Sequence, residues 1–225
     1  MMTSDNTLQI GQGIYTIREM AQILGQPYHR VYRWVNTYWD ERLGESYGEL
    51  YSWRVEGSQA VGFHTLVEFY LLILFGEAGV APRKVLEAHR ELYQLKGTPF
   101  PFANREVLKS LRTDGTHIYF ELPDGEIMTL DGTRQLNMEF VELFFKKLSF
   151  DTEGMASSFW PLGKEKAIVV DPARKFGHPL IAGHNIYPET LLDHFKAGDP
   201  IPYIAHVYQL SEQQVADALE FCQAA

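Results

Sequence analysis

The chain has 225 residues, of which 45% are hydrophobic and 22% charged, a composition that excludes disordered and fibrous architectures. Its length suits one large domain or two to three small ones. A single cysteine, Cys222, excludes an internal disulfide and a thiolate metal cluster, so we expect a reducing, cytoplasmic location. The polar N-terminus and the short longest apolar stretch, residues 69–75, predict neither a signal peptide nor a membrane span.

The net charge of −9 is unevenly distributed along the chain. Residues 1–112 contain 12 basic and 12 acidic side chains, whereas residues 113–225 contain 8 basic and 17 acidic ones. A neutral half with local basic clusters can approach a phosphate backbone, and a strongly acidic half is repelled by it. The charge distribution therefore predicts two halves with different partners.

The first predicted unit is a pair of short helices. Thr16 and Glu19 have the spacing of a capping box, in which each side chain bonds an unpaired backbone amide. Gly25 is placed to end this first helix, and Pro27 is placed to begin a second one. Apolar residues give both helices one buried face: Ile17, Met20, Ala21 and Leu24 in the first, and Val31, Trp34 and Val35 in the second. Two short helices joined by a tight glycine turn predict a helix-turn-helix.

The opposite face of the second helix supplies the candidate DNA-binding residues. In a helix-turn-helix the second helix enters the major groove, where arginine pairs with guanine. The candidates are Thr16, Tyr28, His29, Arg30 and Arg33. The alternative is an ordinary amphipathic helix with two solvated arginines.

The middle of the chain predicts a series of short elements. Residues 47–63 are extended and turn-forming, with an interruption at 56–59, where a winged helix would have its wing. Helical periodicity follows at 64–75 and 82–95, then a hairpin of 117–122 and 126–130 around a Pro-Asp-Gly turn. A helix is predicted from about 138 to 148, and residues 151–166, rich in Gly, Ser and Lys, are interpreted as a linker.

The last 60 residues predict a separate small module. A short strand at 168–170 precedes a glycine-bounded extended stretch at 177–183 and three helices, at about 188–197, 201–207 and 211–222. Asp199 is placed to cap the second of these helices, and Ser211 with Gln214 forms another capping box. The apolar residues expected to form one core are Leu191, Leu192, Phe195, Ile201, Ile204, Ala205, Val207, Tyr208, Leu210, Val215, Ala218, Leu219 and Phe221.

This module has helix-turn-helix outlines but an unsuitable charge for DNA. Residues 187–225 carry six acids and one base, so the module lacks the cationic side chains that dominate affinity for nucleic acid. We therefore expect it to contact a protein.

The C-terminal motifs resemble a family of bacterial antitoxins, the VapB-type group with domain of unknown function four-three-three. The resemblance rests on residues 168–172 (Ile-Val-Val-Asp-Pro), 177–183 (Gly-His-Pro-Leu-Ile-Ala-Gly) and 208–211 (Tyr-Gln-Leu-Ser). In longer members of this family, a winged helix-turn-helix domain similar to that of MerR regulators precedes the C-terminal module. A linker that contains Trp-Pro joins the two. Residues 14–112 resemble that domain, and Trp160-Pro161 resembles that linker.

The resemblance implies an antitoxin, without catalytic residues, metal or cofactor, that forms a homodimer. Its partner would be a PIN-like ribonuclease toxin, and its N-terminal domain would repress the shared operon by binding operator DNA. The candidate toxin-contact residues are Arg174, Lys175, His178 and His184. Of these, Arg174 and Lys175 are cations that we expect to enter the acidic metal site of the toxin as competing counterions. His178 and His184 depart from the family pattern.

Two further kinds of site are not favoured by the residues. A metal site built from His178, His184, His194 and His206 does not match a known ligand spacing, and Cys222 has no predicted histidine partner. The chain also lacks a phosphate-cradling loop, HExxH and Gly-x-Ser-x-Gly, so an enzyme is not expected. The alternative function is a MerR-like, ligand-responsive regulator without a toxin, with a pocket lined by aromatic residues (Phe140, Phe144, Phe145, Phe159 and Trp160).

The expected fold is therefore mainly α with short β-hairpins, of the α+β class. A winged helix-turn-helix region is expected over 10–112, a hairpin and helix over 113–150, a linker over 151–166, and a three-helix, helix-turn-helix-like module over 167–225.

Overall fold

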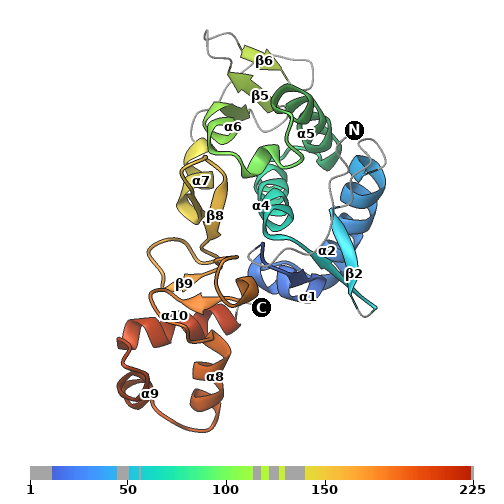
Figure 1. The fold of residues 1–225 in the computed structure, drawn as a ribbon. Helices are drawn as coiled ribbons and strands as arrows, with labels where there is room; N and C mark the ends of the chain where they lie inside the picture. The colour runs from blue at the N-terminus through green and yellow to red at the C-terminus, as the bar shows by residue number, and fades with distance from the viewer. Residues whose placement is uncertain are drawn as a thin grey trace.

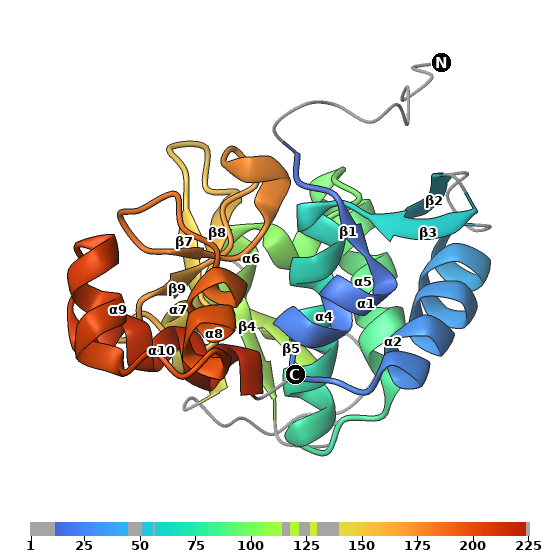
Figure 2. The ribbon, with the colours of Figure 1, turned by 90° about the horizontal axis from the view of Figure 1, so that it is seen from below.

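A computed structural model describes residues 12–44, 51–55, 57–113, 118–121, 127–129 and 140–223. The described chain combines helices with small antiparallel sheets, which confirms the predicted α+β class (Figure 1). The long helix α4 (Phe63–Glu77) lies in the middle of the molecule, with the N-terminal helices on one side and the C-terminal helices at one end (Figures 1 and 2).

The N-terminal elements follow the predicted order. Strand β1 (Tyr15–Thr16) leads into α1 (Ile17–Ile23) and α2 (Tyr28–Trp34), and a π-helical segment, η1 (Val35–Gly44), continues from α2. Strands β2 (Ser52–Val55) and β3 (Ser58–Val61) form a hairpin, and β1 pairs with β3 in a three-stranded antiparallel sheet of order β1-β3-β2. The predicted interruption at 56–59 is thus shorter, because Ser58 and Gln59 belong to β3.

Helix α4 forms the centre of the hydrophobic core. Its sequence is apolar on every side, and nearly all of its side chains are buried, as expected for a helix covered all round. Helix α5 (Pro82–Lys96) is amphipathic and ends at Gly97 in the left-handed conformation. The 3₁₀ turn η2 (Pro101–Ala103) and α6 (Arg105–Ser110) follow. The two helices predicted at 64–75 and 82–95 are confirmed.

A buried ionisable pair fastens α5 and η2 to α4. The Glu68 carboxylate accepts hydrogen bonds from the backbone amides of Phe102 and Ala103 at 2.9 and 3.2 Å. Its other oxygen lies 3.3 Å from Nε2 of His89, and both side chains are fully buried. Burial raises the pKa of Glu68 above its ordinary value, against the opposing effect of His89. The pair therefore connects the three consecutive elements α4, α5 and η2.

The predicted hairpin after α6 is confirmed and gains a third strand. Strands β5 (Ile118–Glu121) and β6 (Ile127–Thr129) pair antiparallel, and β4 (Leu111–Thr113), which was not predicted, pairs with β5. The predicted Pro-Asp-Gly turn at 123–125 lies outside the described residues.

The expected linker contains a strand. After the predicted helix α7 (Phe140–Lys147), strand β7 (Leu148–Phe150) pairs with β8 (Ala156–Phe159). Phe159 is buried and lies 5.0 Å from the ring of Tyr70 on α4. Side chains from β8, α4 and the C-terminal helices belong to one continuous core. The two halves of the chain are therefore packed together rather than joined by a free linker.

The C-terminal module has the predicted elements. Strands β9 (Ile168–Val169) and β10 (Leu180–Ile181) pair antiparallel around a 3₁₀ turn, η3 (Lys175–Gly177). Helices α8 (Pro188–Lys196), α9 (Ile201–Tyr208) and α10 (Glu212–Gln223) follow and lie together at one end of the molecule (Figures 1 and 2).

Three details of the predicted module are wrong. Phe195 and Val207 are 41% and 47% exposed and do not belong to its core, because helical periodicity does not reveal which apolar side chains a small bundle covers. Asp199 does not cap α9: Pro200 is the N-cap residue, and the Asp199 carboxylate instead bonds Nδ1 of His194 at 2.7 Å.

Candidate functional site

The start of α1 is fixed by the predicted capping box. The Glu19 amide donates to the Thr16 hydroxyl at 3.2 Å, and the Thr16 amide donates to the Glu19 carboxylate at 2.7 Å. The reciprocal bonds fix the direction in which α1 leaves strand β1. Thr16 thus acts as a helix cap.

The outer face of α2 is polar, aromatic and exposed. Tyr28, His29, Arg30 and Arg33 all point away from the core, which agrees with their predicted exposure. Tyr32, which is not among the predicted residues, joins them: it is 44% exposed, and its ring stacks on that of Tyr28 with the centroids 6.0 Å apart. The spacing of four residues between the two tyrosines could have indicated this pair.

Arg30 is held in one orientation on this face. Its Nη1 donates to Oε1 of Gln26 at 2.9 Å, and its guanidinium lies 4.4 Å from the ring centroid of Trp34. A guanidinium stacked on an aromatic ring and anchored by a hydrogen bond loses less conformational entropy when it binds a ligand. Arg30 is therefore held in one orientation on the exposed face of α2.

A hydrogen-bond network connects η1, which continues from α2, to the β2–β3 hairpin. Asn36 and Gln59 exchange side-chain hydrogen bonds at 3.0 and 3.1 Å, and Gln59 also donates to Ser52 and Asp40. Burial raises the pKa of Asp40, although hydrogen bonds from Ser52 and Gln59 oppose the shift. The network fixes the hairpin relative to the exposed face of α2.

The segment around η3 presents two side chains on a strained turn. Lys175 and Phe176 both have positive φ, 47° and 57°, a conformation that bulky side chains rarely adopt. Phe176 is 66% exposed, and Lys175 is exposed beside it. Arg174, by contrast, donates to the carbonyl of His184 at 2.6 Å and to Oδ1 of Asn185 at 2.8 Å. Of the two predicted counterions, only Lys175 is presented outward, because Arg174 spans the loop and holds the turn.

His178 connects the C-terminal module to α1. Its Nε2 lies 3.4 Å from the Glu189 carboxylate on α8, and its Nδ1 lies 4.0 Å from the Glu19 carboxylate on α1. The hydrogen bond to Glu189 raises the pKa of His178, and burial opposes this shift. The amide of Ile14 also donates to the carbonyl of Phe176 at 3.0 Å. The predicted toxin-contact residue His178 thus faces the N-terminal half of its own chain.

Gly177, next to His178, lies close against the side chain of Tyr15 on β1. Gly177 has φ +86°, and a Cβ atom on it would lie 2.1 Å from the hydroxyl of Tyr15. Tyr15 is buried, and desolvation raises the pKa of its hydroxyl. The glycine in the C-terminal motif therefore makes room for a side chain of β1.

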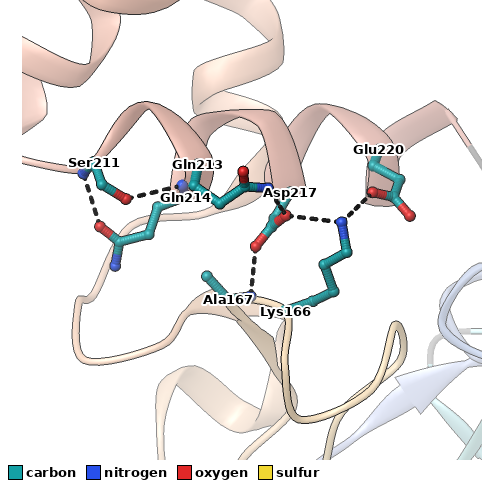
Figure 3. Close-up of polar contacts among 7 residues, drawn as sticks. All are labelled: Lys166, Ala167, Ser211, Gln213, Gln214, Asp217 and Glu220. Carbon is teal, nitrogen blue, oxygen red and sulfur yellow. Dashed lines mark hydrogen bonds and ion pairs between the residues drawn. The ribbon is translucent and has the colours of Figure 1, made fainter.

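A buried aspartate fastens α10 to the start of β9 (Figure 3). The Asp217 carboxylate accepts from the Ala167 amide at 2.9 Å, from Nε2 of Gln213 at 2.8 Å and from Nζ of Lys166 at 3.2 Å. Lys166 also bonds Glu220 at 2.8 Å. Burial acts to raise the pKa of Asp217, but its hydrogen-bond partners act more strongly in the opposite direction, so the pKa is lowered overall. No sequence motif singles out Asp217.

The second predicted capping box lies at the start of the same helix. The Ser211 amide donates to Gln214 at 2.9 Å, and the Gln214 amide donates to the Ser211 hydroxyl at 3.1 Å (Figure 3). The box is confirmed and, with Asp217, fixes both the start and the middle of α10.

The remaining candidate groups do not form a metal site in the described part of the chain. His194 bonds Asp199 and the hydroxyl of Tyr208 at 2.9 Å, and His184 contributes its backbone carbonyl to Arg174. No cluster of three or more metal-ligating side chains occurs among the described residues. Burial raises the pKa of Cys222 to about 11, so its thiol is protonated and unreactive at neutral pH.

Comparison with known proteins finds a family match for the C-terminal module. Residues 168–222 match the family described as "Protein of unknown function (DUF433)", the group that the motifs resemble. This match covers β9 through most of α10, the part that Arg174 and Asp217 hold together.

Two proteins of Mycobacterium tuberculosis are similar to the chain over longer stretches. One is a putative antitoxin, VapB45, 26% identical over 179 residues, which covers 73% of this chain and 72% of that protein. The other is the uncharacterized protein Rv2308, 25% identical over 225 residues, covering 96% and 92%. The matches support a relationship to an antitoxin-like family.

The fold has a solved counterpart. The crystal structure of Rv2018 from Mycobacterium tuberculosis is similar with a TM-score of 0.68, at 19% identity, over 91% of this chain and 96% of that one. The common architecture thus extends through both halves. Within the described residues, no helix is both long and apolar enough to cross a membrane.

Proposed function

We propose that the protein is the antitoxin of a type II toxin–antitoxin pair. The observation that carries the proposal is the similarity to the putative antitoxin VapB45, which covers 73% of this chain, together with the family match over residues 168–222. In this proposal, the C-terminal module neutralises a PIN-like ribonuclease, and a homodimer of the chain represses the operon that encodes both proteins. The protein itself has no catalytic role.

The N-terminal half is proposed to bind operator DNA as a MerR-like winged helix-turn-helix. The element order β1-α1-α2 followed by the β2–β3 hairpin supports this, with α2 as recognition helix and the hairpin as wing. Arg30 and Arg33 would contact guanine edges, and Tyr28, Tyr32 and His29 would contact the flanking backbone. Thr16 caps α1, the helix that precedes the proposed recognition helix.

The C-terminal module is proposed to bind the toxin. Its acidic surface suits a ribonuclease, because an enzyme that binds RNA presents cationic side chains to the phosphates. The exposed turn of Lys175 and Phe176 supplies one apolar anchor and one cation for the acidic metal site of the toxin. Arg174 holds this turn by donating to the backbone carbonyl of His184, and His178 lies next to it and contacts Glu189 on α8.

Reciprocal substitutions in the full-length chain test the proposal. The protein is co-expressed with the product of the adjacent gene, and complex formation, ribonuclease activity and binding to the upstream DNA are measured. Arg33→Ala is expected to weaken DNA binding by about tenfold, the loss of one base contact, while toxin capture is unchanged. Lys175→Glu is expected to weaken toxin capture while DNA binding is unchanged. An adjacent product that neither binds the chain nor cleaves RNA would refute the antitoxin assignment.

Full-length variants are needed because the two halves share a core. A fragment ending near residue 155 would lack β8, whose Phe159 packs on Tyr70, and would leave β7 without its partner strand. Loss of function in such a fragment would therefore report misfolding and not a division of roles.

A further inference from the structure

We propose that the cavity between α1, α4, α7 and β8 is a binding site for a small organic carboxylate with an apolar body. The cavity has a volume of about 240 Å³. Its occupation does not depend on a toxin, so the site goes beyond the function proposed above.

The inner part of the cavity is apolar and built from three distant segments. Leu24 lines it from the end of α1, Ile73 and Leu74 from α4, and Phe159 from β8. Ile73, Leu74 and Phe159 belong to the continuous core, so these walls are fixed before a ligand enters. A preformed apolar cavity of this size suits the hydrocarbon part of a small molecule.

The polar groups that line the cavity favour an anion. Lys146 and Lys147 at the end of α7 face it together with Glu77 at the end of α4. The ammonium group of Lys147 lies 5.9 Å from the ring centroid of Tyr70 and donates to the carbonyl of Pro161 at 2.6 Å. This carbonyl is its one hydrogen-bond acceptor among the described residues, although an ammonium carries three donors. A carboxylate placed between the lysines would accept the remaining donors.

Burial gives independent support for this orientation of the ligand. Desolvation lowers the pKa of Lys147, and the nearby carboxylates Glu77 and Glu165 only partly oppose the shift. A bound anion would stabilise the protonated ammonium in its half-buried position. The charged end of the ligand therefore belongs at α7, and its apolar end belongs against α1 and α4.

The cavity also reaches the candidate recognition helix. Gln26 forms part of its wall, and the same side chain accepts the hydrogen bond that orients Arg30. A ligand that contacts Gln26 would compete for this amide and change the freedom of Arg30. This consequence rests on the proposed function, since it affects only the affinity for DNA.

Calorimetric titration of the full chain tests the site directly. Octanoate serves as the probe, and octanol and octylammonium have the same chain without a charge or with the opposite charge. Saturable binding of octanoate, at least about tenfold tighter than that of either control, is expected because only the carboxylate satisfies the lysines. Absence of saturation, or equal binding of the three probes, would overturn the proposal.

Variants locate the binding. Lys146→Ala removes an exposed cation without disturbing the core and is expected to weaken octanoate binding by several-fold. Leu24→Phe, at a half-buried position, is expected to fill the cavity and abolish binding. Lys109→Ala on α6 is the matched control, since Lys109 is also an exposed lysine but bonds Glu106 away from the cavity. Equal binding in all four proteins would place octanoate elsewhere and refute the site.

The effect on DNA is measured separately, by fluorescence anisotropy with the upstream DNA in the presence and absence of octanoate. A changed affinity that is lost in Gln26→Ala supports the connection to Arg30, and an unchanged affinity contradicts it. If the chain does not bind this DNA at all, the proposed function fails while calorimetry still decides the cavity.

Discussion

Removal of the Asp217 carboxylate should lower the free energy of unfolding, because this one side chain connects α10 to the segment before β9. Asp217 is 2% exposed and accepts three hydrogen bonds, one from a backbone amide at the start of β9 and two from side chains. In Asp217→Ala, the Ala167 amide and the Gln213 amide lose a charged acceptor. The Ala167 amide is half-buried and the Gln213 side chain is exposed, so water replaces part of the lost hydrogen bonding, and we expect a loss of about 1–2 kcal/mol in the free energy of unfolding.

The assay is urea unfolding followed by far-UV circular dichroism, with the free energy of unfolding compared at constant slope. Asp217→Asn is the conservative variant, because it keeps one acceptor for Ala167 and should lose roughly half as much. Glu220→Ala removes the other partner of Lys166, at an exposed position, and should have a clearly smaller effect. A stability of Asp217→Ala within about 0.5 kcal/mol of the parent would refute the role assigned to this carboxylate.

The same carboxylate gives a dependence on pH with a defined sign. The hydrogen-bonded environment lowers the pKa of Asp217 in the folded chain below the ordinary value of an aspartate. Its contribution is therefore complete above that value and is lost as the pH falls through the folded-state pKa. The difference in stability between the parent and Asp217→Asn should shrink in strongly acidic solution.

Three further predictions concern the α2 face and the junction between the halves. Arg33→Ala should weaken binding to the upstream DNA by about 1–3 kcal/mol in a gel-shift titration, and equal shifts would exclude a base contact. His178→Gln should lower the free energy of unfolding by up to about 1 kcal/mol below pH 6.5, and the difference should vanish as the pH rises through the raised pKa of His178; a difference constant across this range would contradict the ion pair. Gly177→Ala should lower the melting temperature more than Gly183→Ala, which has a similar φ but an open environment; equal losses would exclude the contact with Tyr15.

Local patterns predicted much of the secondary structure. Both capping boxes have the expected reciprocal bonds because Thr16 and Ser211 lie three residues from their partners, a distance the helix itself fixes. Helices α8 and α9 have no capping box and were predicted from the helical spacing of their apolar residues and from the Gly and Pro residues at their ends. Strand β8 was missed because Ser157 and Ser158 give it a polar sequence, and its pairing with β7 is a contact between segments.

The candidate sites were only partly predictable, since their contacts connect residues far apart in the sequence. The exposed face of α2 follows from helical periodicity, and the structure agrees with it. The orientation of Arg174 toward the His184 carbonyl and the position of Asp217 under Ala167 do not follow from any local pattern. Likewise, the exposure of Phe195 depends on how the three small helices pack, which composition does not encode.

Reconstitution with the product of the adjacent gene tests the central claim most directly. The purified full-length chain is mixed with that protein, and the mixture is assayed by size-exclusion chromatography with light scattering and by cleavage of a fluorescent RNA. The account predicts a stable complex in which the partner's ribonuclease activity is suppressed, with suppression weakened by Lys175→Glu. Two separate elution peaks and unchanged RNA cleavage would contradict it.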